Sequence, residues 1–266
     1  ARRTNNYWLH PLPHFHHWCE VIRISLEDDT VHHHFYQELT FPYPAHRPFI
    51  ACNMVTSLDG KVTADGTQPS SLGSSFDLKT MGVIRSHFDA VLAGGNTIRL
   101  HPYYLGVPVE LEGSRQGRGL ARQPLTVLLT QSGNLDPFSS LFTKAPRPPI
   151  IITSTAGAQN LTSSIQGQSK IEIMENPDPQ SITTLLQTKY AVKRLLVEGG
   201  PSVNYQFMQA KLMDDLFLTL HPSLIGKRTD LSLSAGDHVL EKAHDIQLIS
   251  VNREGNELFL HYRITW

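Results

Sequence analysis

The sequence predicts an α/β fold, a mixed and mostly parallel sheet flanked by helices that ends in an antiparallel C-terminal hairpin. Three observations lead to this prediction. Short runs of consecutive apolar residues recur along the chain, which is typical of strands covered on both faces. Segments with helical spacing separate several of these runs, as in sheets whose strands are joined by helices. The last two runs are separated only by residues 253–256 (REGN), which favours a hairpin turn.

The predicted elements follow one another from residue 47 onward. Buried strands are expected over residues 48–55, 89–93, 125–130, 150–153, 171–174, 195–197 and 216–220, and the hairpin strands over 246–253 and 257–264. Helices are expected over residues 78–87 and 181–190 and from Pro201 onward. Residues 113–123 are polar and rich in glycine, so we expect a surface loop there.

The composition excludes several classes of partner. The 266 residues are 40% hydrophobic, which is enough for one large domain with an extension. A net charge of −1 and the lack of a long Lys or Arg block argue against nucleic acid and anionic membranes as partners. No apolar run approaches the roughly 20 residues of a membrane helix. The sequence shows no secretory signal, and its two cysteines, Cys19 and Cys52, are far apart, so we expect a cytoplasmic protein.

Residues 1–46 differ from the rest of the chain and are predicted to be an N-terminal extension to a domain over residues 47–266. They hold more than half of the fourteen histidines and many aromatic residues. A strand over 21–26 and a short helix over 30–39 are possible there. The histidines at 14, 16, 17 and 32–34 suggest a metal site, but no Cys or carboxylate falls at a characteristic ligand spacing. We therefore favour a packed or surface histidine cluster and predict no metal.

Residues 195–202 (LLVEGGPS) have the pattern of a ligand-binding turn. An apolar strand ends at Glu198, two glycines follow, and Pro201 suits the first turn of a helix. Gly199 and Gly200 allow a ligand to approach the main chain, and a helix N-terminus favours a phosphate. A carboxylate at the end of such a strand faces the crevice where open α/β sheets bind ligands. The alternative is that the glycines only make a tight turn.

Residues 89–97 (DAVLAGGNT) repeat this design. Here an apolar strand ends at Gly94 and Gly95, which are followed by the polar Asn96 and Thr97. Two glycine turns at strand ends in one domain predict two walls of a single cleft.

Three blocks resemble the pyrimidine reductase family of riboflavin biosynthesis, which has a dihydrofolate-reductase-like fold. They are residues 47–63 (RPFIACNMVTSLDGKVT), 84–102 (IRSHFDAVLAGGNTIRLHP) and 195–226 (LLVEGGPSVNYQFMQAKLMDDLFLTLHPSLIG). The family includes stand-alone dimers and the C-terminal half of a bifunctional deaminase-reductase. The resemblance therefore implies a homodimer that uses NADPH to reduce the ribose of a phosphorylated pyrimidine to a ribityl chain.

The resemblance also implies roles for individual residues. Asn53 and Glu198 match the catalytic and substrate-binding positions, and Arg85 matches an arginine near the substrate phosphate. The positions expected at the NADPH cofactor are Ser57, Asp59, Gly94, Gly95, Thr97, Gly199, Gly200, Pro201 and Ser202.

Some of these residues have a simpler explanation. Asp59 and Ser57 can be turn formers, and Arg85 can be a solvated arginine on a helix surface. Asn53 cannot be dismissed in this way, because a lone polar side chain in an apolar strand costs free energy unless it forms hydrogen bonds.

The sequence also departs from the family pattern. After the first glycine turn the family has acidic residues and then an arginine for the substrate phosphate, whereas this chain has His101 and no arginine beyond Arg99 until Arg115. Neither cysteine can supply the zinc signature of the deaminase half, so no deaminase is expected in these residues.

Three functional hypotheses therefore stay open. The first is the riboflavin-pathway reductase. The second is an NADPH-dependent reductase of the same fold that acts on another pterin or pyrimidine. The third is a non-catalytic dimer that binds a nucleotide.

Overall fold

The structure is a computed structural model that describes residues 35–42, 44, 46–62, 72–229, 231–240 and 245–266. The described residues do not include the histidine cluster, Cys19, the expected strand over 21–26 or the first half of the expected helix over 30–39. Residues 35–38, which were expected to be helical, form a turn instead.

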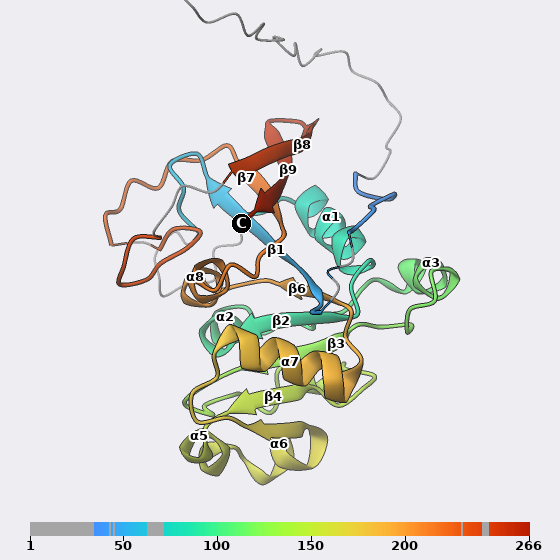
Figure 1. Cartoon of the computed structure of the whole chain (residues 1–266), viewed down its shortest axis with the longest axis vertical. Helices are drawn as coiled ribbons and strands as arrows, with labels where there is room; N and C mark the ends of the chain where they lie inside the picture. Colours follow the sequence, from blue (N-terminus) through green and yellow to red (C-terminus); the bar gives the residue numbers. More distant parts are fainter. Residues whose placement is uncertain (1–34, 43, 45, 63–71, 230, 241–244) are drawn as a thin grey trace, which may run out of the picture. The chain divides into compact units, whose positions relative to one another are not determined.

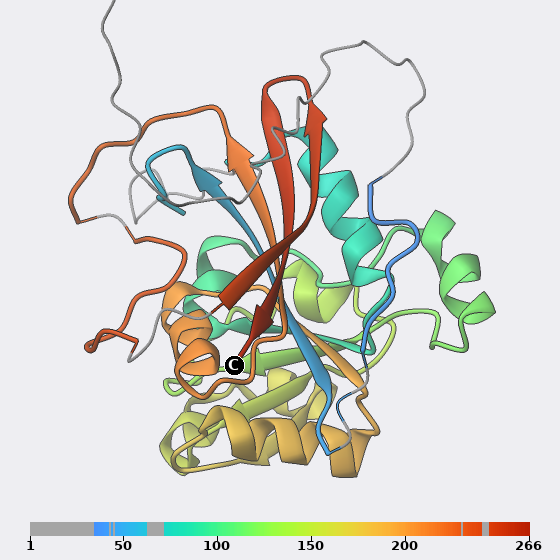
Figure 2. The ribbon, with the colours of Figure 1, turned by 45° about the horizontal axis from the view of Figure 1, so that its top comes forward.

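A nine-stranded sheet with the order β5-β4-β3-β2-β6-β1-β7-β9-β8 organises the described chain (Figure 1). The strands are β1 Phe49–Ser57, β2 Ala90–Gly94, β3 Leu125–Leu129, β4 Ile150–Thr153, β5 Lys170–Ile173, β6 Arg194–Val197, β7 Asp215–His221, β8 Asp245–Glu254 and β9 Glu257–Thr265. The pairs from β5 through β7 are parallel, and β9 joins β7 and β8 in antiparallel pairs. Figure 2 shows the β8–β9 hairpin as the long red arrows at the C-terminal end. The predicted fold class is therefore confirmed.

Helices connect the parallel strands. They are α1 Ser75–Arg85, α2 Gly95–Leu100, α3 Glu112–Gly117, α4 Ser140–Thr143, α5 Thr155–Asn160, α6 Ser163–Gln168, α7 Pro179–Tyr190 and α8 Pro201–Gln209, with a 3₁₀ turn at Val109–Leu111. Local sequence explains where the longer ones begin. Asp178 caps α7 by accepting hydrogen bonds from the Gln180 and Ser181 amides, and Ser74 caps α1 in the same way.

The central strands of the sheet are buried on both faces, as the apolar runs predict, whereas the edge strands β5 and β8 are more exposed. Alternate residues of β1 belong to different core clusters, because successive side chains of a strand point to opposite faces. Ile50 and Cys52 pack with α7 and α8, while Phe49 and Ala51 pack on the face that contacts Ile84 of α1. We call this second face the α1 face of the sheet.

The loop prediction for residues 113–123 is wrong for its first part only. Residues 112–117 form α3, and Arg115 is 0% exposed within it, whereas residues 118–123 are irregular, as predicted. The Arg115 guanidinium donates hydrogen bonds to the carbonyls of Arg85 (3.0 Å) and Phe88 (2.8 Å), at the C-terminal end of α1. Burial lowers its pKa to about 10. Tertiary contacts therefore override the low helix propensity of this glycine-rich segment.

Residues 35–42 pack on the sheet rather than standing apart from it. The Phe35 ring lies 5.4 Å from the Phe259 ring, and the Phe41 ring lies 4.8 Å from the Phe49 ring. The described end of the predicted extension therefore belongs to the same core, and a domain boundary at residue 46 stays a prediction.

Candidate active site

The two diglycine turns meet at the carboxyl ends of neighbouring strands. β2 pairs with β6, with Leu92 opposite Val197, so both strands end at the same edge. The Gly94 amide donates a hydrogen bond of 2.7 Å to the Gly199 carbonyl, and the Glu198 amide donates one of 2.9 Å to the Leu92 carbonyl. The predicted single cleft therefore has a structural basis in two turns that touch through their main chains.

A side chain at either turn would crowd a threonine hydroxyl. A Cβ added to Gly200 would lie 3.0 Å from Oγ1 of Thr97, and one added to Gly95 would lie 2.9 Å from Oγ1 of Thr130. Gly199 has a φ of +81°, a conformation that strongly favours glycine, and the peptide between Gly199 and Gly200 is cis. The glycines therefore keep main-chain surface open at this edge of the sheet.

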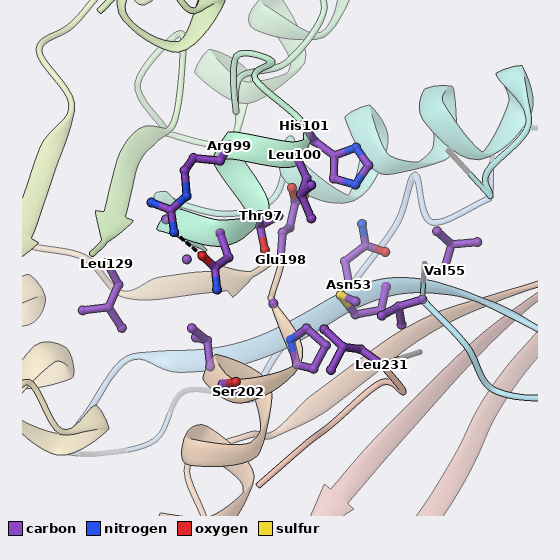
Figure 3. Close-up of a pocket in the computed structure, with 18 of the residues that line it drawn as sticks. Asn53, Val55, Thr97, Arg99, Leu100, His101, Leu129, Glu198, Ser202 and Leu231 are labelled. Atoms are coloured by element: carbon purple, nitrogen blue, oxygen red, sulfur yellow. Dashed lines mark hydrogen bonds between the residues drawn. The ribbon is translucent and has the colours of Figure 1, made fainter. Parts of the chain in front are cut away.

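A cavity of about 550 Å³ opens at these turns. Figure 3 shows side chains from α2, α8 and β1 around this space, with Thr97 and Ser202 from the two helices and Asn53 from the strand. The polar residues that line it include Asn53, Asp77, Asn96, Thr97, Arg99, His101, Tyr103, Thr130, Gln131, Ser132, Glu198, Ser202 and Gln206. Apolar side chains fill much of the remaining wall, among them Val55, Val62, Leu72, Leu78, Met81, Leu100 and Leu231.

Two helices begin at the glycine turns without a side-chain cap. Pro201 starts α8, as predicted, with Gly200 as its N-cap, and Gly95 starts α2, with Gly94 as its N-cap. The first amides of a helix have no partner within it. The amides of the nine-residue α8 next to Ser202 are therefore available to an anion at the cavity wall.

Glu198 forms a buried ion pair with Arg85 across 113 residues of sequence. Arg85 Nε donates to Oε1 at 2.7 Å and Nη2 donates to Oε2 at 2.5 Å, and both side chains are at most 5% exposed. The remaining nitrogen, Nη1, donates to the Gly106 carbonyl at 3.1 Å. The interpretation of Arg85 as a solvated surface arginine is therefore wrong. Its contact with a substrate phosphate stays a prediction, and Arg85 is not among the described residues that line the cavity.

Asn53 lies on the α1 face of β1 and lines the cavity. Within the described part of the chain, its side-chain amide has no protein hydrogen-bond partner. The half-buried amide is therefore free to meet water or a ligand, which accounts for a polar residue in an apolar strand.

Asp77 is a site residue that the sequence analysis missed. It lies in the first turn of α1, lines the cavity, and is close enough to Thr219 for that side chain to act on its carboxyl. Burial, and then the nearby Glu257 and Glu198, raise its pKa to about 6. A signal existed, because a Ser followed by an acid three residues later often marks a helix start. The carboxylate does fold back over Gly73, next to the start of α1, and both residues line the cavity.

Ser57 and Asp59 build a turn outside the cavity lining. The Ser57 hydroxyl donates to Oδ1 of Asp59 at 2.6 Å, and the Gly226 and Ile225 amides donate to the same carboxylate at 2.7 and 3.1 Å. The Ser57 bond, followed by those of Gly226 and Ile225, lowers the Asp59 pKa to about 2. Neither residue lines the cavity among the described residues, so their contact with a cofactor stays a prediction.

The described residues contain no group of three His, Cys, Asp or Glu side chains arranged to hold a metal ion. Among the helices of that same part of the chain, none has the length and apolar character needed to cross a bilayer.

Comparison with known families identifies the chain. The model of the RibD C-terminal domain family matches residues 48–260. The chain belongs to this family. The match covers all of the residues that line the cavity and confirms the family predicted from the three sequence blocks.

Relatives of this RibD C-terminal domain include named reductases. A 2,5-diamino-6-ribosylamino-4(3H)-pyrimidinone 5′-phosphate reductase of Methanothermobacter thermautotrophicus is 24% identical and aligns with 82% of this chain and 99% of its own. The protein of the same name from Archaeoglobus fulgidus is 23% identical over 74% of this chain and 90% of its own. A pyrimidine reductase-like protein of Corynebacterium diphtheriae has a solved structure that matches with a TM-score of 0.71 and 24% identity, over 82% of this chain and 92% of that one. The structural match supports the fold alone.

Proposed function

We propose that this chain is the NADPH-dependent reductase of riboflavin biosynthesis. It would reduce the ribose of 5-amino-6-(5-phosphoribosylamino)uracil, or of its diaminopyrimidine analogue, to a ribityl chain. One observation carries the proposal: two glycine turns that touch each other open onto the same cavity as Asn53 and Glu198, in a chain of the RibD C-terminal domain family. The curated relatives named as reductases of such a pyrimidine support it.

The main-chain amides at the glycine turns suit the negatively charged pyrophosphate that links the two halves of a dinucleotide. We assign the cofactor contacts to Gly94, Gly95, Thr97, Gly199, Gly200, Pro201 and Ser202. A Cβ at Gly200 would occupy the space where main-chain amides and the uncapped α8 meet an anion. When bound, NADPH supplies the hydride, and the protein's part is to align the acceptor carbon and exclude water.

Asn53 and Glu198 are assigned to the substrate. Both lie on the α1 face beside the glycine turns, and the Arg85 pair holds the Glu198 carboxylate in one orientation. The Asn53 amide offers both a donor and an acceptor to the ribose. The apolar side chains around the cavity reduce the access of water to this position.

A second candidate function follows from the charges in the cavity. Arg99 is the only Lys or Arg among the described residues that line it, and it bonds to Asn96 beside α2. Around Asn53 the charged side chains that line the cavity are the acids Asp77 and Glu198. A phosphate at that end would meet no Lys or Arg among the described residues that line the cavity, which favours a reductase that acts on another pterin or pyrimidine.

NADPH oxidation at 340 nm tests these two functions. The proposed enzyme consumes NADPH with 5-amino-6-(5-phosphoribosylamino)uracil or the diaminopyrimidine analogue and not with dihydrofolate. Turnover with dihydrofolate, or with the dephosphorylated pyrimidine alone, would establish the second function instead. Glu198→Gln should weaken turnover more than NADPH affinity, and the opposite pattern would move Glu198 to the cofactor side. A protein that binds NADPH and oxidises it with none of these compounds would be the non-catalytic nucleotide binder.

We also propose that the protein is a homodimer. β8 is an edge strand of the described sheet, and Ile246, Leu248 and Ile249 on it are 52%, 43% and 42% exposed. An exposed apolar edge strand is a template for pairing with a second chain. Sedimentation equilibrium should give about twice the chain mass of 29.8 kDa, and a monomer at micromolar concentration would exclude the dimer.

A further inference from the structure

The proposed reduction needs a proton as well as a hydride, and this inference rests on that proposed function. Hydride addition forms a C–H bond at ribose C1′, while the C1′–O4′ bond breaks and its electron pair stays on O4′. The carbon is reduced and NADPH is oxidised to NADP⁺. The oxygen must take a proton, and a positioned side chain can deliver it in the transition state. Sequence patterns alone do not indicate which side chain does so.

We propose that Asp77 is the general acid of this reduction and delivers its proton to ribose O4′. Asp77 then regains a proton from water. Asn53 and Val55 are successive residues on the α1 face of β1, about 7 Å apart along the strand. Thr219 pairs with Val55 in the β1–β7 register, on the same face, and its side chain acts on the Asp77 carboxyl. Asp77 therefore lies one step along the face from Asn53, in the lining of the same cavity.

Glu198 is a poor candidate for this proton because of its contacts. Each of its two oxygens accepts a hydrogen bond from Arg85, at 2.7 and 2.5 Å, and the pair is buried. A proton on either oxygen would displace a charge-assisted hydrogen bond and leave the Arg85 charge uncompensated in the interior. The two carboxyl groups of the cavity thus have different surroundings, a pattern that separates acid and electrostatic roles in other active sites.

The groups that face Asp77 favour its protonated form. Glu257 of β9 and Glu198 at the end of β6 are acids that raise its pKa, whereas the Thr219 side chain and, less strongly, His221 of β7 lower it. Tyr103 and Tyr36 also face this carboxyl, and Asp77 contributes to raising the pKa of each phenol. Burial is the largest cause, and together these effects raise the Asp77 pKa to about 6. A catalytic acid is most effective when its pKa is near the working pH.

The other protonatable groups on the cavity wall are less suited. Burial lowers the pKa of His101, which disfavours the protonated imidazolium that would have to donate the proton. Burial raises the pKa of Tyr103 above its usual value, which makes its phenol a weaker acid. His101 remains the main competitor, because it occupies the place of the family's acidic residues after the first glycine turn.

Kinetic pH profiles of three variants test the proposal. Asp77→Asn should lower kcat/KM by about 10²-fold or more and remove the fall in rate that the wild type shows above about pH 6. Glu257→Gln removes a like charge and should move that fall to lower pH. Asp136→Asn makes the same chemical change at an exposed loop and should leave rate and profile within twofold. NADPH affinity should stay within threefold in all three.

A measurement without turnover complements the kinetics. Protein labelled with ¹³C at the aspartate carboxyls should show one resonance that titrates near pH 6 and is missing in Asp77→Asn. The proposal is overturned if Asp77 titrates below about pH 4.5, if Asp77→Asn keeps the wild-type profile, or if the profile is lost only in His101→Asn. A wild type that oxidises NADPH with neither pyrimidine would instead overturn the proposed function, and the acid role with it.

Discussion

The two sides of the cavity differ in what forms their surface, which is main chain on one side and charged side chains on the other. On the corner side, Gly94–Thr97 and Gly200–Val203, the main chain makes much of the surface, and the glycines keep it open. On the α1 side, the surface depends on buried charged side chains, with Asp77 facing acids and Glu198 tied to Arg85. A main-chain surface suits a ligand that all members of a family share, such as a cofactor. Charged side chains suit the binding of a particular substrate and the transfer of a proton to it.

The largest expected effect comes from breaking the buried ion pair on the α1 side. Arg85→Met leaves the Glu198 carboxylate buried without its partner, so we expect a loss of about 3–5 kcal/mol in the free energy of unfolding. Urea denaturation measures this loss. Arg122→Met is the matched control, because Arg122 is 68% exposed in its pair with Glu112 and should cost less than about 1 kcal/mol.

The double variant Arg85→Met with Glu198→Gln sharpens this test. It removes both charges, so it should recover part of the stability that Arg85→Met loses. A loss below 1 kcal/mol in Arg85→Met would mean that the α1 side does not depend on this pair.

A smaller effect is expected at Asp77, and it should depend on pH. The folded-state pKa of about 6 lies above the value of 3.8 for a free aspartate, so burial of Asp77 leaves stability intact below about pH 4 and reduces it as the pH rises through 6. Asp77→Asn removes this penalty. The substitution should raise the free energy of unfolding by about 2 kcal/mol at pH 8 and change it little at pH 4.

Unfolding curves at the two pH values measure the difference. An equal effect at both would show that the Asp77 carboxyl titrates normally and that the charges of the α1 side do not act on it.

The smallest effect concerns α3, which supports the α1 side through Arg115. Gly113 lies inside this helix with open space around it, so Gly113→Ala should stabilise the protein by about 0.5–1 kcal/mol. Gly119, just after the helix, also has open space around it, but its φ is +74°, a conformation that an alanine adopts with strain. Gly119→Ala should therefore destabilise the protein by about 1 kcal/mol. Thermal melts compare the two. If Gly113→Ala gives no gain, residues 113–123 behave as the loop that their composition suggests.

The corner side could be predicted from sequence because its information is local. A strand, two glycines and Pro201 lie within eight residues, and each has a conformational reason for its place. Because β2 and β6 are parallel neighbours in the sheet, both strands end at the same edge, which brings the two glycine turns together.

The contacts between side chains on the α1 side could not be predicted, because they join residues that are far apart in the sequence. Arg85 and Glu198 meet across 113 residues, and Arg115 reaches back to the end of α1 from a segment with the composition of a loop. The acidity of Asp77 depends on Glu257, which is brought close only by the C-terminal hairpin. Composition and spacing carry no signal for such pairs.

The central claim is that NADPH lies across the two glycine turns, and a fluorescence titration of NADPH tests it most directly. The wild type and Gly113→Val, a glycine with open space, should bind NADPH with the same affinity. Gly200→Val should lose at least 100-fold in affinity while its circular dichroism stays native, because the new side chain occupies the space beside Thr97. Wild-type affinity in a folded Gly200→Val protein would contradict the account.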